Sequence, residues 1–311
     1  MSAEPPEHVS VLYKESLDAL AIVEDGIYVD GTFGRGGHSQ AILDRLGQGG
    51  RLFALDKDPE ALEYAKETLE EDSRFTIVQS SFAELERMAQ QWGIVGNVNG
   101  VLLDLGVSSP QLDDASRGFS FRQDGPLDMR MNPEQGKSAA EWLATVKEAD
   151  LTQVIKTYGE ERYAKRIARA IVNTRAKQAI NTTSQLAKIV AEAHPAWEKG
   201  KHPATRTFQA IRIYINQELD DLKSVLGQAA DILAPGGRLA VISFHSLEDK
   251  IVKQFIQRES SAGDIPPGLG VPESYIHRKL KRVGKMIHPS EQECQQNSRA
   301  RSARLRIAEK M

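Results

Sequence analysis

The chain of 311 residues contains one cysteine, Cys294, and no apolar stretch of membrane-spanning length. A single cysteine excludes an internal disulfide and any multi-cysteine zinc cluster, and it is typical of proteins in a reducing compartment. A membrane-spanning helix needs about 20 consecutive apolar residues. Residues 1–8 also lack the basic and apolar layout of a signal peptide. We therefore expect a cytoplasmic protein with no membrane partner.

Net charge is low as well, at −3, but the charges are unevenly distributed. Residues 277–311 contain ten lysines and arginines and three glutamates, a charge of +7 that leaves −10 for the rest of the chain. A basic end on an acidic protein indicates a local contact with a polyanion. A solvated charged surface is the alternative interpretation.

A glycine-rich segment, Asp30–Ser39, follows the strand-like run Gly26–Val29 and precedes a helical pattern at Ser39–Leu46. Glycine has no Cβ, so the backbone can approach a ligand closely and can adopt positive φ. A strand, a glycine-rich turn and a helix in this order predict the mononucleotide-binding half of a doubly wound α/β fold. A purely structural turn is the alternative.

Acidic residues at two predicted strand ends indicate which ligand this loop binds. Asp30 would repel a pyrophosphate, but it would attract an amine or a sulfonium, and S-adenosylmethionine carries both. The second strand, Arg51–Leu55, is followed by Asp56, near the position where an acidic residue is expected to bind ribose hydroxyls.

Strand-like runs alternate with helical patterns in the first hundred or so residues, which predicts a parallel sheet. They are Ile27–Val29, Leu52–Leu55, Phe75–Val78 and Val101–Leu103. Helical periodicity then dominates and includes a long helix at Thr205–Leu226, before a turn at Ala234–Gly237 and a strand at Arg238–Phe244. We predict a sheet domain in two pieces, 1–112 and 213–311, interrupted by a helical domain at 113–212.

The first and fourth strands are expected to flank the point where the strand order reverses, because ligands bind there in such sheets. Asp30 and Asp104 would then lie on neighbouring strand ends. The segment Leu102–Leu112 would form the other side of the crevice, although its Asp-x-Gly turn could also be purely structural.

Six segments of this chain together closely resemble the bacterial 16S rRNA cytosine-N4 methyltransferase family. They are Asp30–Ser39, Leu103–Leu112, Arg117–Phe121, Asp124–Met131, His202–Ala210 and Ser243–Asp249. The resemblance extends from about His8 to Ile307. It implies a Rossmann-like class I methyltransferase sheet domain with an inserted all-helical domain. The implied substrate is 16S rRNA, in its decoding region and within a small ribosomal subunit.

The resemblance also implies S-adenosylmethionine as cofactor and a set of residues that bind it. They are Gly36, Gly37, His38, Asp56, Phe82, Asp104 and Gln111. Phe82 follows the third strand, where an aromatic face can pack on adenine; a core role is the alternative.

Residue types favour the exocyclic N4 over ring carbon five as the methylated atom. Methylation at carbon five needs a thiolate that adds to the ring, and the single thiol, Cys294, lies in a polar tail. The N4 amine can attack the methyl group directly if it is held in line and its developing charge is stabilised. We predict a combined cofactor-binding and catalytic role for Asp104; Ser108 is a weaker candidate.

The predicted helix Glu160–Lys177 has one basic side and one apolar side. Arg162, Arg166 and Arg169 fall in one arc with Lys165, which suits the backbone of an RNA whose target base is extruded. An ordinary solvated helix surface is the alternative.

Three histidines could gather near the crevice: His38, His202 and His245. Because no acidic or cysteine ligand spacing accompanies them, we predict no metal site. His245 could instead be a hydrogen-bonded residue at a strand end.

Two other functions share parts of this pattern. A nicotinamide-dependent oxidoreductase begins with the same β-α-β unit, but Asp30 and the glycine spacing disfavour it. A ribosome-assembly factor would use the basic tail and retain the cofactor site as a relic. The sequence leaves the oligomeric state open, with a homodimer as one alternative.

Overall fold

The computed structural model describes residues 10–196, 200, 202–261 and 278–311, so the signal-peptide assessment of residues 1–8 lies outside it. The chain divides into two compact units. We call the unit made of residues up to Gly106 and from Asp220 onward the sheet unit, and the unit Val107–Leu219 the helical unit. The sequence analysis places these boundaries at 112/113 and 212/213.

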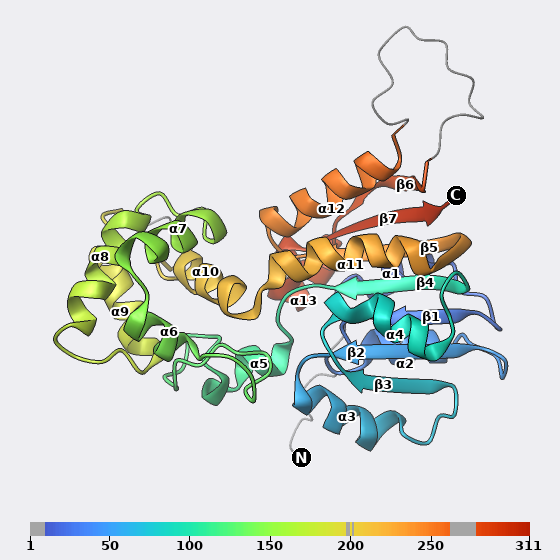
Figure 1. The fold of residues 1–311 in the computed structure, drawn as a ribbon, viewed down its shortest axis with the longest axis horizontal. Helices are drawn as coiled ribbons and strands as arrows, with labels where there is room; N and C mark the ends of the chain where they lie inside the picture. Colours follow the sequence, from blue (N-terminus) through green and yellow to red (C-terminus); the bar gives the residue numbers. More distant parts are fainter. Residues whose placement is uncertain (1–9, 197–199, 201, 262–277) are drawn as a thin grey trace, which may run out of the picture. The chain divides into compact units, whose positions relative to one another are not determined.

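The sheet unit contains a seven-stranded sheet in the order β3-β2-β1-β4-β5-β7-β6. The strands are β1 (Ile27–Asp30), β2 (Arg51–Asp56), β3 (Phe75–Gln79), β4 (Val98–Asp104), β5 (Leu233–Ser243), β6 (Leu280–Ile287) and β7 (Arg304–Lys310). Neighbouring strands from β3 to β5 are parallel, whereas β7 runs antiparallel to both β5 and β6. Figure 1 shows blue strands from the start of the chain joined to orange and red strands from its end. This architecture confirms the predicted α/β class.

Helices cover the sheet on both faces, which explains the continuous apolar runs of its central strands. The helices of this unit are α1 (Tyr13–Leu20), α2 (Gly37–Leu43), α3 (Pro59–Leu69), α4 (Leu85–Trp92), α11 (Glu218–Ile232, from Asp220 onward), α12 (Ser246–Glu259) and α13 (Glu291–Gln296), with short 3-10 turns η1 (Phe82–Glu84) and η4 (Ser298–Ser302). Alternate residues of β4 enter different cores: Val101 and Leu103 pack with residues of α4, α11 and α12, and Leu102 packs with residues of α1, α2 and α3.

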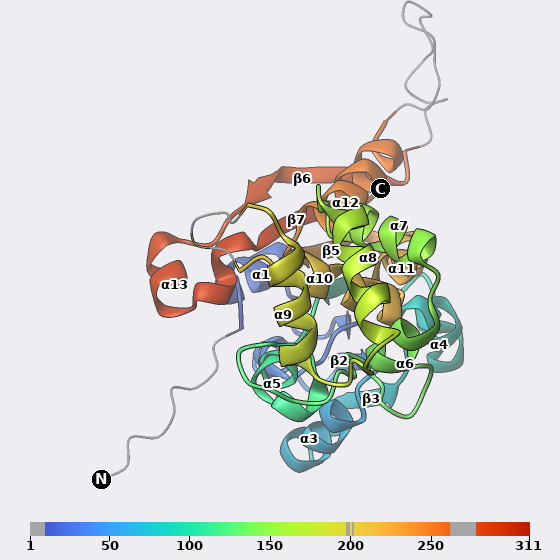
Figure 2. The same cartoon turned by 90° about the vertical axis from the view of Figure 1, so that its left-hand side faces the viewer.

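Two strands near the end of the chain have no counterpart in the sequence analysis. β7 lies between β5 and β6, and both views show β6 and β7 side by side (Figures 1 and 2). The carboxylate of Asp249 on α12 accepts hydrogen bonds from Arg304, at 3.0 Å, and Arg306, at 2.7 Å. Basic residues therefore hold this antiparallel edge against a helix, and their charge obscures the strand pattern in the sequence.

The turn predicted at Ala234–Gly237 lies inside β5. Leu233 already pairs with Val98, and the register shifts before Arg238 pairs with Gly100. Gly236 has a φ of +81°, so the four residues form an irregularity within the strand, and the strand begins earlier than predicted.

The helical unit consists of short helices around its own apolar core. They are α5 (Ser109–Asp113), η2 (Ala115–Arg117), α6 (Ala139–Thr145), α7 (Glu148–Tyr158), α8 (Ala164–Arg175), α9 (Thr183–Ala193) and α10 (Thr205–Asn216). Within its described residues the β-structure is one isolated bridge, Pro126 to Thr182. In the described part of the chain, no helix is long and apolar enough to cross a membrane.

The single long helix predicted at Thr205–Leu226 is wrong. Gln217 adopts a left-handed conformation with φ 56°, and it separates α10 from α11. The side chain of the preceding residue, Asn216, donates to the carbonyl of Met129 at 2.8 Å and accepts from the amide of Met131 at 2.7 Å. These contacts fix the end of α10.

The basic helix predicted at Glu160–Lys177 is shorter than expected. Glu160 has a φ of +49°, and α8 begins only at Ala164. Its apolar side is nevertheless buried as predicted, at Ala164, Ile167, Ala168 and Ile171.

Candidate active site

The candidate site lies at the carboxyl ends of β1 and β4. These strands are neighbours, and the chain continues to β2 on one side and to β5 on the other, so the strand order reverses between them. The prediction that Asp30 and Asp104 lie on adjacent strand ends is confirmed. Ligands bind at such a reversal point in parallel sheets.

Asp30 holds the glycine loop in place. Its side chain is 1% exposed; Oδ2 accepts a hydrogen bond from Ser39 Oγ at 2.7 Å, and Oδ1 accepts one from the Thr32 amide at 3.0 Å. Burial raises the pKa of Asp30, although the Ser39 hydrogen bond and the nearby His38 oppose that rise. We expected Asp30 to face a cationic ligand; instead its oxygens are used inside the protein, because the loop folds over it.

Thr32 is a residue of the candidate site that was not predicted from the sequence. Its hydroxyl accepts a hydrogen bond from the Asp104 amide at 2.7 Å and lies 3.4 Å from Asp30 Oδ1, so it connects the two strand ends. The signal was present in the sequence: an aspartate side chain often accepts a hydrogen bond from the backbone amide two residues on, as Asp30 does from Thr32.

Asp56 fastens the same loop to β2. Its Oδ2 accepts from the Gly34 amide at 2.8 Å and its Oδ1 accepts from the Asp58 amide at 2.9 Å. Burial, with a smaller contribution from the charges of Asp58 and Asp30, raises the pKa of Asp56 to about 6 despite these hydrogen bonds. The carboxylate therefore titrates close to neutral pH.

Glycine is required at position 36 and fits closely at position 37. Gly36 precedes α2 with a φ of +70°, and a Cβ there would lie 2.7 Å from the Phe33 ring. A Cβ on Gly37 would lie 2.2 Å from the hydroxyl of Ser10, so a side chain there would require that hydroxyl to move. The conformation of the loop therefore depends on Gly36 in particular.

His38 and Asp104 form a buried polar pair. The His38 side chain is 6% exposed and that of Asp104 is 25% exposed, and Nε2 lies 3.6 Å from Asp104 Oδ2. Within the described part of the chain, Oδ1 of Asp104 makes no hydrogen bond, and neither nitrogen of His38 has a partner at ordinary hydrogen-bond distance, although Asp104 and the Val11 backbone lie close enough to raise the pKa of His38. Buried polar atoms in native proteins are usually bonded, so this pair has capacity for a ligand.

Phe82 and Gln111 lie in different units. Phe82 begins η1 after β3. A Cβ added to Gly31 would lie 3.4 Å from the Cβ of Phe82, so Phe82 borders the glycine loop. Gln111 belongs to the helical unit, where it completes a capping box with Ser108 at the start of α5.

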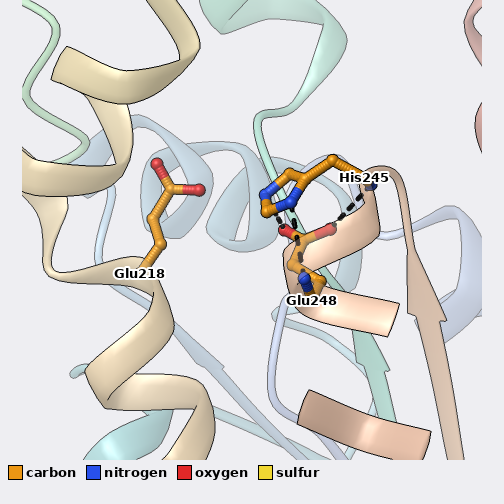
Figure 3. A group of neighbouring side chains, drawn as sticks. All are labelled: Glu218, His245 and Glu248. Atoms are coloured by element: carbon orange, nitrogen blue, oxygen red, sulfur yellow. Dashed lines mark hydrogen bonds and ion pairs between the residues drawn. The ribbon is translucent and has the colours of Figure 1, made fainter. Parts of the chain in front are cut away.

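Of the three histidines singled out in the sequence, His38 and His245 belong to the sheet unit and His202 belongs to the helical unit. His245 caps α12: its Nδ1 accepts from the Glu248 amide at 3.4 Å, and its Nε2 lies 3.1 Å from Glu248 Oε1 (Figure 3). Glu218, also labelled there, is bound by Arg212 at 2.8 and 2.7 Å within the helical unit. His202 belongs to that unit too and packs against Phe121, with ring centroids 4.6 Å apart.

The predicted RNA-binding residues all lie on the surface of the helical unit. Arg162, Arg166 and Arg169 are exposed. Arg162 lies before α8 with its guanidinium over the Tyr163 ring, and Arg169 is 3.5 Å from Glu148 Oε1. Arg166 projects from the first turn of α8.

The strand order, the glycine loop after β1 and the acidic residues that end β1, β2 and β4 define a class: the Rossmann-like methyltransferases that use S-adenosylmethionine. The family model described as "MraW methylase family" matches residues 6–311. The chain belongs to the MraW methylase family.

Two named relatives match nearly the whole of this chain. A protein of Marinomonas sp. (strain MWYL1) called Ribosomal RNA small subunit methyltransferase H is 55% identical over 312 residues, covering 100% of this chain and 99% of its own. One of the same name from Coxiella burnetii (strain RSA 331 / Henzerling II) is 57% identical over 304 residues, which cover 98% of this chain and 99% of that protein. A crystal structure of an rRNA methylase from Streptococcus thermophilus aligns with a TM-score of 0.44 at 11% identity, and the alignment covers 100% of this chain and 99% of that chain. The family assignment rests on the sequence matches.

Proposed function

We propose that this chain transfers a methyl group from S-adenosylmethionine to the exocyclic N4 of a cytosine in 16S rRNA, in the decoding region that the family resemblance implies. The observation that carries the proposal is the full-length identity, 55% and 57%, with relatives called Ribosomal RNA small subunit methyltransferase H. The position of Cys294 supports N4 over carbon five, because this one thiol lies on α13 and not at the strand ends.

The polar groups at the strand ends fit the proposed cofactor. Asp104 has a buried oxygen that makes no hydrogen bond among the described residues, and Asp56 has a carboxylate at the end of β2. We assign Asp56 to the ribose hydroxyls, Phe82 to the adenine face, and Gly36, Gly37 and His38 to the loop that borders the donor. Gln111 stays a predicted contact. Bound S-adenosylmethionine supplies an electrophilic methyl group on a sulfonium.

Asp104 is the proposed acceptor for the target amine. The end of β4 is held in place because the Asp104 amide donates to Thr32 Oγ1. An anionic oxygen in a partly buried site can hold the amine in line and stabilise the positive charge that develops on nitrogen. Asp104 therefore combines the cofactor-binding and catalytic roles.

A stacked base cannot reach a site at the carboxyl ends of β1 and β4, so the target cytosine has to be extruded. The exposed arc of Arg162, Arg166 and Arg169 on the helical unit is suited to RNA phosphates. We propose a small ribosomal subunit as the substrate particle, which locates the reaction in the cytoplasm.

Mapping of 16S rRNA by mass spectrometry tests the proposal. A strain lacking this gene should lose one N4-methylcytosine, the wild-type gene should restore it, and a gene with Asp104→Asn should not. If the modification pattern is unchanged in the deletion strain, the proposal is wrong.

Methyl incorporation separates an enzyme from an assembly factor. The purified protein should transfer labelled methyl groups into small subunits from the deletion strain and transfer fewer into naked 16S RNA. Binding of subunits without incorporation would favour the assembly factor.

A further inference from the structure

His38 is a buried base that the proposed reaction has not yet used. It follows the two glycines of the loop in the first turn of α2 and is 5% exposed. Among the described residues neither ring nitrogen has a partner at ordinary hydrogen-bond distance, and its polar neighbours are the Val11 backbone and the Asp104 carboxylate, whose Oδ2 lies 3.6 Å from Nε2. Buried polar atoms in native proteins are usually bonded, so the imidazole keeps capacity to exchange a proton with Asp104.

Among the described residues, the groups named beside His38 on β4, β1, α1 and the segment before α1 are acceptors or a ring, and none of them is a cation. β4 contributes Asp104, β1 contributes Asp30, and the segment before α1 contributes the Val11 backbone. The ring of Tyr13 on α1 stacks at 6.3 Å, with 19° between the planes. These surroundings favour a proton on the imidazole once one is available.

Burial alone lowers the pKa of His38, but the nearby Asp104 and Asp30 outweigh burial and raise that pKa above the ordinary 6.5. The imidazole of His38 beside Asp104 therefore has a higher pKa than a free imidazole in water. A proton acceptor next to the reacting amine needs this property.

We propose that His38 acts through Asp104 as the final holder of the proton that the cytosine N4 loses during methyl transfer. This inference rests on the proposed function. The N4 lone pair forms the new N–C bond while the C–S bond breaks and leaves its electron pair on sulfur. The nitrogen then carries one proton in excess. Asp104 takes that proton and passes it to Nε2 of neutral His38, and the resulting carboxylate–imidazolium pair returns it to solvent.

The proposal predicts how the single-turnover rate of methyl transfer depends on pH. His38 has to be neutral before the step, so the single-turnover rate should rise as pH increases through the pKa of His38. A histidine that only lines the cofactor would instead change the KM for S-adenosylmethionine and leave the rate at saturation unchanged. The two roles are therefore separable by kinetics.

The first measurement uses the protein without cofactor. NMR titration of the imidazole signals should give His38 a pKa above 6.5, and Asp104→Asn should lower it. Asp44→Asn is the matched control, because Asp44 is an exposed carboxylate at the other end of the same helix. An Asp104→Asn variant that leaves the His38 titration unchanged overturns the pairing.

The second measurement uses small subunits and labelled donor. His38→Gln should lower the single-turnover rate about 10- to 100-fold and abolish its rise with pH, with the KM for S-adenosylmethionine changed far less. If the variant keeps the wild-type rate and pH profile, His38 does not hold the proton. If the wild-type enzyme itself transfers no methyl group, the proposed function fails instead, whatever the titration shows.

Discussion

At the scale of single residues, the carboxylates of the site differ in what they can still bind. Asp30 is surrounded by its own loop, whereas Asp104 keeps a buried oxygen without a hydrogen bond in the described residues. Asp56 is intermediate: two backbone amides bind it, yet it titrates near neutral pH. The hydrogen bonds that each carboxylate already makes inside the protein therefore separate their roles.

Asp56 should make cofactor binding depend on pH. With a pKa of about 6, its ionised form disappears as pH falls from 7 to 5, and a neutral acid is a weaker acceptor for ribose hydroxyls. Affinity for S-adenosylmethionine, measured by calorimetry, should fall roughly 10-fold over that range. Asp56→Asn should bind weakly at both pH values. An affinity that stays constant in the wild-type protein would remove Asp56 from the ribose contact.

At the scale of elements, the parts of the fold governed by local patterns were predictable and those fixed by distant contacts were not. β1 to β4 appear where the apolar runs predict them, because their apolar side chains pack into the cores on the two faces of the sheet. The break between α10 and α11 was missed because apolar three-four spacing continues through it. The break depends on Asn216, which binds Met129, 87 residues away.

In the candidate site too, the features set by local sequence were predictable and those set by distant contacts were not. Its glycine loop and acidic strand ends follow from local sequence, and strand adjacency follows from right-handed crossovers. The burial of Asp30 could not be predicted, since it depends on how the loop folds back through Thr32 and Ser39. The antiparallel strand β7 was missed because Arg304 and Arg306 interrupt its apolar pattern and are paired with Asp249 only in the folded chain.

Substitutions at the end of α10 should have opposite effects on stability. Asn216→Ala removes hydrogen bonds to the Met129 carbonyl and the Met131 amide, and should lower the free energy of unfolding by about 2–3 kcal/mol. Gln217→Gly relieves a left-handed conformation and should raise it by about 1 kcal/mol. Urea denaturation measures both. A stabilising Asn216→Ala or a destabilising Gln217→Gly would contradict this account of the helix break.

At the scale of the whole molecule, the basic residues are clustered although the net charge is −3, and such clusters favour a polyanionic partner. Basic residues collect in the last 35 residues and on the exposed arc at the start of α8. Binding to RNA phosphates releases counterions, so affinity should fall steeply with salt.

Arg166→Glu should weaken binding to small subunits and reduce the slope of log affinity against log salt by about 1. Lys188→Glu is the matched control, because Lys188 is an exposed cation on α9 of the same unit. Filter binding at several salt concentrations measures both variants. Equal slopes for the wild-type protein and Arg166→Glu would exclude the arc from the RNA contact.

The order of the last strands in the sheet determines when each of them can pair during synthesis of the chain. β7 fits between β5 and β6, so a growing chain that has already produced Ile287 still lacks the strand that must join its two neighbours. Until residues 304–310 leave the ribosome, β5 has an uncovered edge able to pair with a foreign strand. The helical unit ends at Leu219, so its folding does not depend on the last residues of the chain. Premature termination in the last few codons should therefore yield an aggregating protein, even though every residue of the glycine loop has been made.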